Sequence, residues 1–134
     1  MSIYIDSSAL LKRYLDEEHS AHCDEVLSCD DQWLTARHTW VEVLRNLARL
    51  LDGSERARME AAFRQDWQRF SVVELDVATC EIAADIAATH GTRTLDALHL
   101  AAVARVGGSA LPILTYDLKQ AKVARALGFP VLGP

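Results

Sequence analysis

The chain has 134 residues, of which half are hydrophobic and a quarter are charged, and 19 acidic side chains outnumber 14 basic ones to give a net charge of −5. This length predicts a single domain spanning residues 1–134 with one sizeable core, and the composition excludes disordered and fibrous proteins. The negative charge disfavours broad non-specific binding to nucleic acid, which depends on Lys and Arg at phosphates.

The sequence also lacks the usual signs of export or of membrane insertion. No apolar run is long enough to cross a bilayer, and the first residues form a strand-like pattern without a basic leader, so we expect a cytoplasmic protein with no membrane contact. The three cysteines, Cys23, Cys29 and Cys80, form no C-x-x-C pair and predict neither a disulfide framework nor a structural zinc site.

Strand-like runs alternate with helical patterns along the whole chain. In chain order we expect a strand at 3–5, helices from Ser7 or Ser8 to Glu17 and at 20–27, a strand at 33–35, helices at 37–51 and 54–70 with Ser54 as a cap, a strand at 71–75, helices at 77–90 and 94–106, a strand at 113–115, a helix at 118–127 and a strand at 131–132. Gly91 stands where a left-handed residue would end the helix before it. The alternation predicts an α/β protein, a three-layer α/β/α domain with a central, mostly parallel sheet of four to five strands.

Three aspartates occupy positions typical of an active site in such a sheet. Asp6 and Asp117 each follow a predicted strand, and Asp96 opens a predicted helix. Ligands and chemistry gather at the carboxyl ends of parallel strands. Taken singly, Asp6 and Asp96 are better explained as a helix cap or an acid in the first helical turn, so only the combination of acids indicates a site.

Glu42 is a weaker candidate when judged by periodicity alone. Its position on the helical wheel lies nearly opposite the apolar stripe of Trp40, Leu44, Leu47 and Leu51, which predicts a solvated side chain.

Carboxylates that converge within a few ångströms repel one another unless a cation is bound between them. An all-oxygen ligand set suits Mg²⁺ or Mn²⁺, and such an ion activates water for hydrolysis of a phosphodiester.

Four segments carry a resemblance to a known family: Tyr4-Ile5-Asp6-Ser7-Ser8-Ala9-Leu10-Leu11-Lys12, Trp40-Val41-Glu42-Val43-Leu44, Arg93-Thr94-Leu95-Asp96-Ala97-Leu98-His99-Leu100-Ala101 and Thr115-Tyr116-Asp117. In their order and spacing the sequence resembles the PIN-domain nucleases, and specifically the VapC toxins of bacterial type II toxin–antitoxin modules. The resemblance implies an acidic catalytic and metal site of Asp6, Glu42, Asp96 and Asp117, with Ser8 and Thr115 as supporting hydroxyls. It also implies an endoribonuclease that cuts a cellular RNA, tRNA or another structured RNA, with a VapB-like antitoxin as partner and a homodimeric state.

Roles for these residues follow from the chemistry of the implied site. We predict that Asp6 and Asp96 bind the first ion directly, while Glu42 and Asp117 hold it through water or bind a second ion. Arg37, Arg45 and Arg93 are candidate phosphate contacts, although plain surface charge explains them equally well. We interpret His99 as a structural group in preference to a general base.

Two other functions remain open on the sequence alone. One is a catalytically silent module that only binds a partner. Trp33 and Trp40 are candidate exposed contacts for the antitoxin or a second copy, and the sequence explains them equally as core residues. The other is a receiver-like signalling domain, which is disfavoured because Asp6 is followed by Ser7 and Ser8 and not by a second acid.

Overall fold

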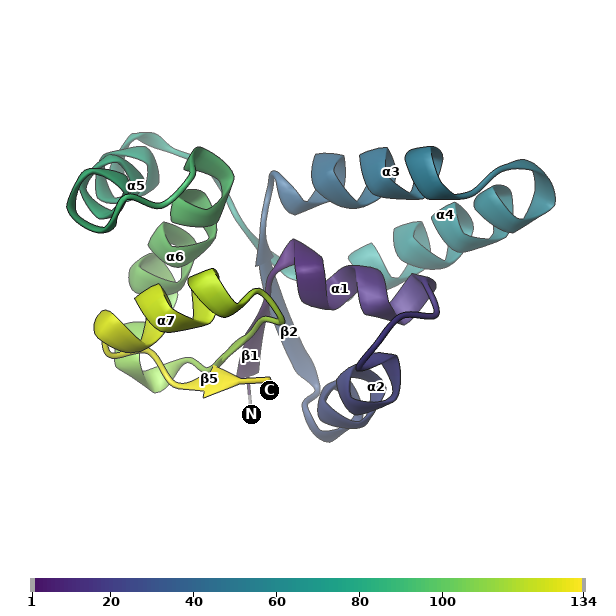
Figure 1. The fold of residues 1–134 in the computed structure, drawn as a ribbon, viewed down its shortest axis with the longest axis horizontal. Coiled ribbons are helices and arrows are strands. Elements are labelled where there is room, and N and C mark those ends of the chain that lie inside the picture. The colour runs from purple at the N-terminus through teal and green to yellow at the C-terminus, as the bar shows by residue number, and fades with distance from the viewer. Residues whose placement is uncertain (1, 134) are drawn as a thin grey trace.

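The computed structural model describes residues 2–133, in which a parallel sheet is covered by helices on both faces (Figure 1). The elements are β1 (Ser2–Ile5), α1 (Ser7–Tyr14), α2 (Ser20–Cys29), β2 (Gln32–Ala36), α3 (Thr39–Leu50), α4 (Gly53–Trp67), β3 (Ser71–Val73), α5 (Val77–His90), α6 (Thr94–Val106), the short 3-10 helix η1 (Gly108–Ala110), β4 (Ile113–Leu114), α7 (Leu118–Ala126) and β5 (Val131–Leu132). This architecture confirms the predicted three-layer α/β/α class.

The sheet has the strand order β3-β2-β1-β4-β5, and every pairing between neighbours is parallel. The first strand lies in the centre, where Ile3 pairs with Trp33 of β2 and Tyr4 pairs with Ile113 of β4. Because all strands run in the same direction, the segments that follow β1 and β4 leave the sheet at one common edge. Asp6 and Asp117 belong to those segments.

The sheet separates two hydrophobic cores, and β1 contributes alternate side chains to each. Ile3 and Ile5 pack with side chains from α1 to α4, whereas Tyr4 packs with side chains from α5, α6 and α7. All three side chains are fully buried. The molecule therefore has two helical layers, α1 to α4 on one face and α5 to α7 on the other (Figure 1).

Most predicted elements are confirmed, and the differences lie at element ends. The helix predicted to begin at a Ser54 cap begins instead at Gly53, and its N-cap residue is Asp52, whose side chain makes no capping bond. The predicted strand at 71–75 ends at Val73 because Val73 pairs with Ala36, the last residue of β2. Gly91 takes the predicted left-handed conformation, with a φ of 67°, at the end of α5.

The tryptophans suggested as exposed contacts do not both lie on the surface. Trp33 is 3% exposed and packs against Phe70 in the core, so its assignment as an exposed contact was wrong. Trp40 is partly buried and packs against Phe63 and Trp67. Within residues 2–133 no helix combines the length and the apolar character needed to cross a membrane.

The three thiols differ sharply in environment, which gives a simple test of the packing. Cys23 is fully buried and donates to the Ala9 carbonyl oxygen at 3.2 Å, and burial raises the pKa of its thiol to about 11. Cys29 and Cys80 are exposed. We expect a thiol reagent such as Ellman's reagent to modify two cysteines of the native protein quickly and the third only after unfolding. Rapid modification of all three would contradict this packing.

Candidate active site

Asp6 directly follows β1 and serves as the N-cap of α1, so its carboxylate lies at the carboxyl edge of the sheet. Its Oδ1 accepts hydrogen bonds from the Ser8 hydroxyl at 2.7 Å and from the Ala9 amide at 3.0 Å. The residue is only 3% exposed, and burial raises the pKa of Asp6 despite the opposing effects of His99, Thr115 and Ser8. A carboxylate in this position is poorly solvated.

Ser8 and Thr115 connect Asp6 to the loop that carries Asp117. The Ser8 hydroxyl lies 3.5 Å from the Thr115 hydroxyl and accepts from the Tyr116 amide at 3.3 Å. Thr115 in turn accepts from the Asp117 amide at 3.2 Å. The two predicted supporting hydroxyls thus join the ends of β1 and β4.

Asp96 and Asp117 lie on neighbouring helices and influence each other electrostatically. Asp117 is the N-cap of α7 and accepts from the amides of Lys119 and Gln120 at 2.9 and 3.1 Å. Asp96 lies in the first turn of α6, and its pKa is raised by burial and by the negative charge of Asp117. The side-chain amide of Gln120 donates to the Asp96 carbonyl oxygen at 3.1 Å and so ties α7 to α6.

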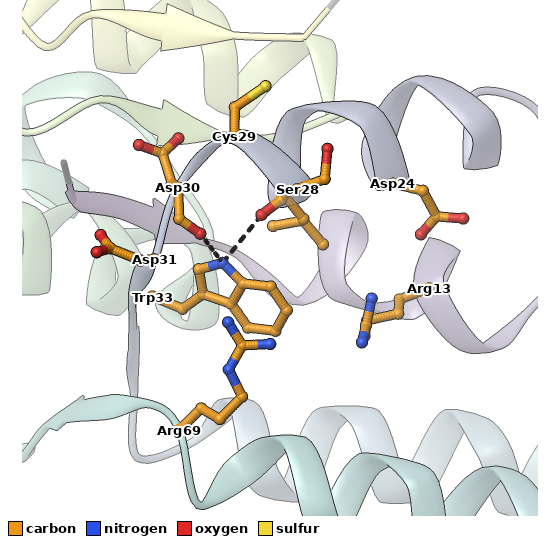
Figure 2. Close-up of a pocket in the computed structure, with 9 residues that line it drawn as sticks. Arg13, Asp24, Ser28, Cys29, Asp30, Asp31, Trp33 and Arg69 are labelled. Atoms are coloured by element: carbon orange, nitrogen blue, oxygen red, sulfur yellow. Dashed lines mark hydrogen bonds between the residues drawn. The ribbon is translucent and has the colours of Figure 1, made fainter.

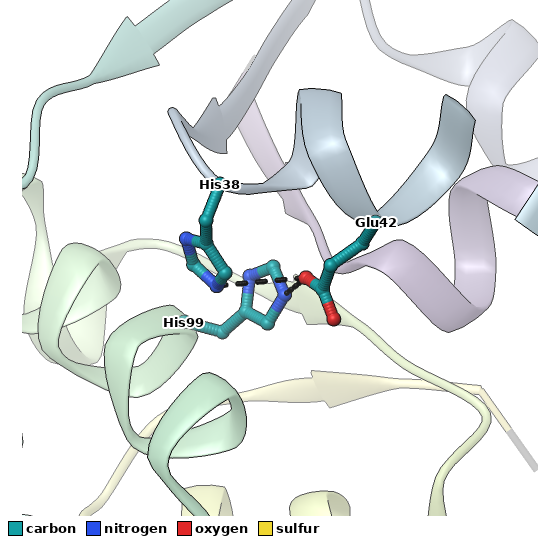
Figure 3. A group of neighbouring side chains, drawn as sticks. All are labelled: His38, Glu42 and His99. Carbon is teal, nitrogen blue, oxygen red and sulfur yellow. Dashed lines mark hydrogen bonds and ion pairs between the residues drawn. The ribbon is translucent and has the colours of Figure 1, made fainter. Parts of the chain in front are cut away.

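Glu42 is not the solvated side chain that its helical position predicts. Its side chain is 21% exposed and accepts hydrogen bonds from His99 Nε2 at 2.9 Å and from the Ser7 hydroxyl. Burial alone would raise the pKa of Glu42, but the hydrogen bonds from His99 and Ser7 and the electrostatic effect of the neighbouring histidines outweigh it, so the pKa lies below its usual value. The periodicity argument failed because the outer face of α3 meets α6 at this edge of the molecule (Figure 3).

A buried chain of hydrogen bonds connects Glu42 to His99 and, through it, to Tyr4 in the core. An ionised carboxylate can only accept, so His99 Nε2 carries the proton that it donates to Glu42. His99 Nδ1 then accepts from the Tyr4 hydroxyl at 2.7 Å, and burial keeps the pKa of Tyr4 well above its usual value, so this hydroxyl stays protonated. No role was predicted from the sequence for Tyr4 or Ser7, although Ser7 follows Asp6 directly and Tyr4 lies two residues before it.

His38 completes a compact group with Glu42 and His99 (Figure 3). Among residues 2–133 this is the one set of three candidate metal ligands whose ligand atoms all lie within 4.8 Å of one another, and it could hold a metal ion. In this structure, however, His38 Nε2 contacts the Leu95 carbonyl oxygen at 3.1 Å, and burial lowers the pKa of His38 to about 4. His38 lies one helical turn before Glu42, which is the spacing that would have identified it.

The three aspartates do not form a set as tight as this group within residues 2–133. They lie, however, at one edge, where burial raises the pKa of Asp6, and burial together with repulsion by Asp117 raises the pKa of Asp96. A hard divalent cation relieves such repulsion and prefers oxygen ligands. The donor set therefore fits Mg²⁺ or Mn²⁺.

The three candidate arginines differ in how freely they can reach a ligand. Arg37 forms a two-pronged ion pair with Glu74, at 2.9 and 2.6 Å, and must leave it to contact a phosphate. Arg93 is 82% exposed, with its Nε 3.4 Å from Asp96 Oδ2. Arg45 is exposed on α3.

A cavity of about 560 Å³ lies elsewhere, around the start of β2 (Figure 2). Its wall includes Trp33, which donates to the carbonyl oxygens of Leu27 and Asp30 at 3.3 and 3.0 Å, and the Arg69 guanidinium packs over the Trp33 ring at 3.9 Å. None of the four predicted acids lines it. This cavity is therefore separate from the acidic edge.

Comparisons with known proteins find relatives that span most or all of the chain. Residues 3–126 match the family model described as PIN domain. Ribonuclease VapC46 of Mycobacterium tuberculosis is 31% identical over 133 residues, which cover 99% of this chain and 98% of that protein. The crystal structure of VapC20 from M. tuberculosis, described as a sarcin-ricin loop cleaving toxin, matches with a TM-score of 0.78 and 18% identity over 98% of this chain and 99% of that one. A toxin–antitoxin complex from Klebsiella pneumoniae matches with a TM-score of 0.70 and 16% identity over 88% of both chains.

Proposed function

Because this chain belongs to the PIN-domain family and to its VapC ribonucleases, we propose that it is a toxin that cuts RNA internally in a reaction dependent on Mg²⁺ or Mn²⁺. The observation that carries the proposal is the common edge at which β1, α3, α6 and α7 present Asp6, Glu42, Asp96 and Asp117. Its substrate is a cellular RNA, either tRNA or another structured RNA. The description of VapC20 as cleaving the sarcin-ricin loop supports a structured target.

In this proposal Asp6 and Asp96 bind the ion directly, and Glu42 and Asp117 hold it through water or bind a second ion. The ion would neutralise charge on the scissile phosphate and make a water molecule more acidic. The protein's own contribution is orientation: Ser8 fixes one oxygen of Asp6, the amides of α7 fix Asp117, and His99 fixes Glu42. The products expected from attack by water are 5′-phosphate and 3′-hydroxyl ends, and recovery of 2′,3′-cyclic phosphates would contradict this mechanism.

The proposed partners are a VapB-like antitoxin that inhibits cleavage and a second copy of this chain. The match to a toxin–antitoxin complex supports the first of these. Copurification with a coexpressed VapB-like antitoxin, followed by light scattering of each protein alone and of the mixture, tests both.

Cleavage of purified total RNA and tRNA by the antitoxin-free protein tests the proposed activity. We expect discrete fragments with Mg²⁺ or Mn²⁺, none with a chelator, and none from Asp96→Asn, because the charge that binds the ion is lost. Asp85→Asn is a matched control, since Asp85 is an exposed aspartate on α5, and it should cut like the native protein. Absence of cleavage together with absence of metal binding would refute the nuclease and favour a module that only binds its partner.

A further inference from the structure

The ring of Tyr116 lies in the loop between β4 and α7 and is held by side chains from the other helical layer. His19, directly before α2, stacks on this ring with the two ring centres 5.6 Å apart and the planes 16° from parallel. His22, in the first turn of α2, lies nearly perpendicular to the ring, and its Nδ1 shares a hydrogen bond of 2.7 Å with the Tyr116 hydroxyl. The Lys12 ammonium group on α1 lies 5.1 Å from the ring centre. These three side chains form a clamp around Tyr116.

The backbone of His19 is strained. Its φ is 69°, and among residues 2–133 it is the one residue other than glycine with a positive φ. L-amino acids with a side chain disfavour this left-handed conformation, and such residues persist, often at functional sites, only where their surroundings hold them. The imidazole has one other neighbour at ion-pair distance, the exposed Glu18 carboxylate at 3.6 Å. The stacking on Tyr116 is therefore the contact that distinguishes histidine from an unstrained glycine at this position.

The backbone of Tyr116 connects the clamp to two of the predicted metal ligands. Its amide donates to the Ser8 hydroxyl at 3.3 Å, and this hydroxyl donates to Asp6 Oδ1 at 2.7 Å. Asp117 is the next residue along the chain. A displacement of the Tyr116 ring would therefore act on Asp6 and on Asp117 at the same time.

The loop also carries a charge that its surroundings repel. The negative charge of Asp117 contributes to the raised pKa of Asp96, so the two carboxylates oppose close approach until a cation binds between them. Repulsion of this kind favours an outward displacement of the loop. The contacts of Tyr116 with α1 and α2 resist that displacement, because they tie the loop to the layer that carries Asp6.

We propose that His19 and His22 are positioning residues for the metal site: they hold Tyr116, and through it Asp117 and the Ser8–Asp6 pair, at the spacing that the ion requires. Neither histidine contacts the ion or the RNA. The inference rests on the proposed metal-dependent ribonuclease function. It adds two residues that lie outside the four segments that carry the family resemblance.

The hydrogen bond is tested with His22→Asn and His22→Leu. Asn places an amide group near the position of Nδ1 and can keep a bond to the Tyr116 hydroxyl, whereas Leu fills a similar space without a polar atom. We expect Mn²⁺ affinity in calorimetric titration to fall on the order of tenfold for the Leu variant, the lower end of the range for loss of a ligand's hydrogen-bond partner. The Asn variant should bind Mn²⁺ like the native protein. Glu25→Leu is the matched control, since Glu25 is exposed on the same helix, and it should leave the affinity unchanged.

The stacking contact is tested with His19→Asn and His19→Phe. Asn tolerates the left-handed conformation but has no ring, whereas Phe keeps a ring on the same strained backbone. Mn²⁺ affinity should therefore fall for the Asn variant and be retained by the Phe variant. The midpoint of urea unfolding should be at least as high for Asn as for Phe. Affinity and stability then change in opposite directions, which a purely structural role of His19 would not produce.

The metal dependence of RNA cleavage gives a readout that loss of folded protein cannot imitate. For His22→Leu and His19→Asn, the Mn²⁺ concentration that gives half-maximal cleavage should rise on the order of tenfold. The rate at saturating Mn²⁺ should stay near that of the native protein, because the bound ion then offsets the repulsion between the carboxylates.

The outcomes separate this inference from the proposed function. Native-like Mn²⁺ affinity in both His22→Leu and His19→Asn would overturn the positioning role even if the protein cuts RNA normally. Equal losses of affinity in the Asn and Leu variants of His22 would overturn the part assigned to its hydrogen bond. If the native protein binds Mn²⁺ but never cuts RNA, and the variants differ in affinity as expected, the ribonuclease proposal fails and the positioning role is supported.

Discussion

Replacement of Asp6 by asparagine is expected to abolish RNA cleavage and at the same time to stabilise the folded protein. Asn keeps an oxygen that can accept from Ser8 and Ala9, and it is as good a helix cap as Asp, so the local structure is retained. The variant loses the negative charge that holds the ion. Because an ion supplies several kcal/mol of charge stabilisation in the transition state, we expect cleavage to fall on the order of a thousandfold.

The gain in stability follows from the raised pKa of Asp6, which burial causes. A carboxyl group whose pKa is higher in the folded protein than in the unfolded chain opposes folding once it is ionised, so at neutral pH the charge of Asp6 costs stability without a bound metal ion. Removal of the charge abolishes this cost. Urea unfolding at pH 7 in the presence of a chelator should show a higher midpoint for Asp6→Asn than for the native protein.

The control for both effects is Asp85→Asn, which removes the same charge from an exposed position. It should change neither the cleavage rate nor the urea midpoint appreciably. Retention of more than a tenth of native cleavage by Asp6→Asn would rule out direct binding of the ion by Asp6.

Substitutions at His99 are expected to show whether this residue positions Glu42 or only fills space in the core. His99→Gln retains an amide donor close to the place of Nε2, so it can still donate to Glu42 while losing the acceptor for Tyr4. His99→Asn has the opposite effect, because its shorter side chain can reach only toward Tyr4. Each variant breaks one buried hydrogen bond that His99 makes, which costs about 1–3 kcal/mol of stability.

If His99 positions Glu42, only His99→Asn should weaken Mn²⁺ binding, by about 10–100-fold, as is typical when a hydrogen-bond partner of a metal ligand is removed. Calorimetric titration with Mn²⁺ measures this, and urea unfolding checks that the two variants are equally stable. Tyr4→Phe should resemble His99→Gln, since it also breaks the bond at Nδ1. Equal Mn²⁺ affinity in the Asn and Gln variants would show that His99 has only a packing role.

The sequence is informative where a feature depends on neighbouring residues. The limits of α5 and α6 follow from the apolar periodicity of each helix and from the glycine after it, and both helices occur at the predicted residues. The parallel sheet follows from the alternation of strands and helices, because strands joined through a helix return in the same direction.

Features that depend on distant residues could not be predicted in this way. A helical wheel describes one helix in isolation, and it correctly places Glu42 away from the stripe that α3 buries. It cannot show that His99, 57 residues later, covers that outer face. Trp33 was misjudged for the same reason, since Phe70 and Arg69, which follow the end of α4, enclose it.

The position of the acids relative to the two cores has a consequence for how the protein loses activity. Asp6 and Glu42 are carried by elements of the α1 to α4 layer, and Asp96 and Asp117 by elements of the α5 to α7 layer. Each layer has its own hydrophobic core, so partial unfolding of one layer can leave the other intact. Unfolding of either layer would separate the four carboxylates. The temperature of heat inactivation would then be set by the less stable layer and not by unfolding of the whole molecule. Hydrogen exchange measured along the chain would reveal which layer that is.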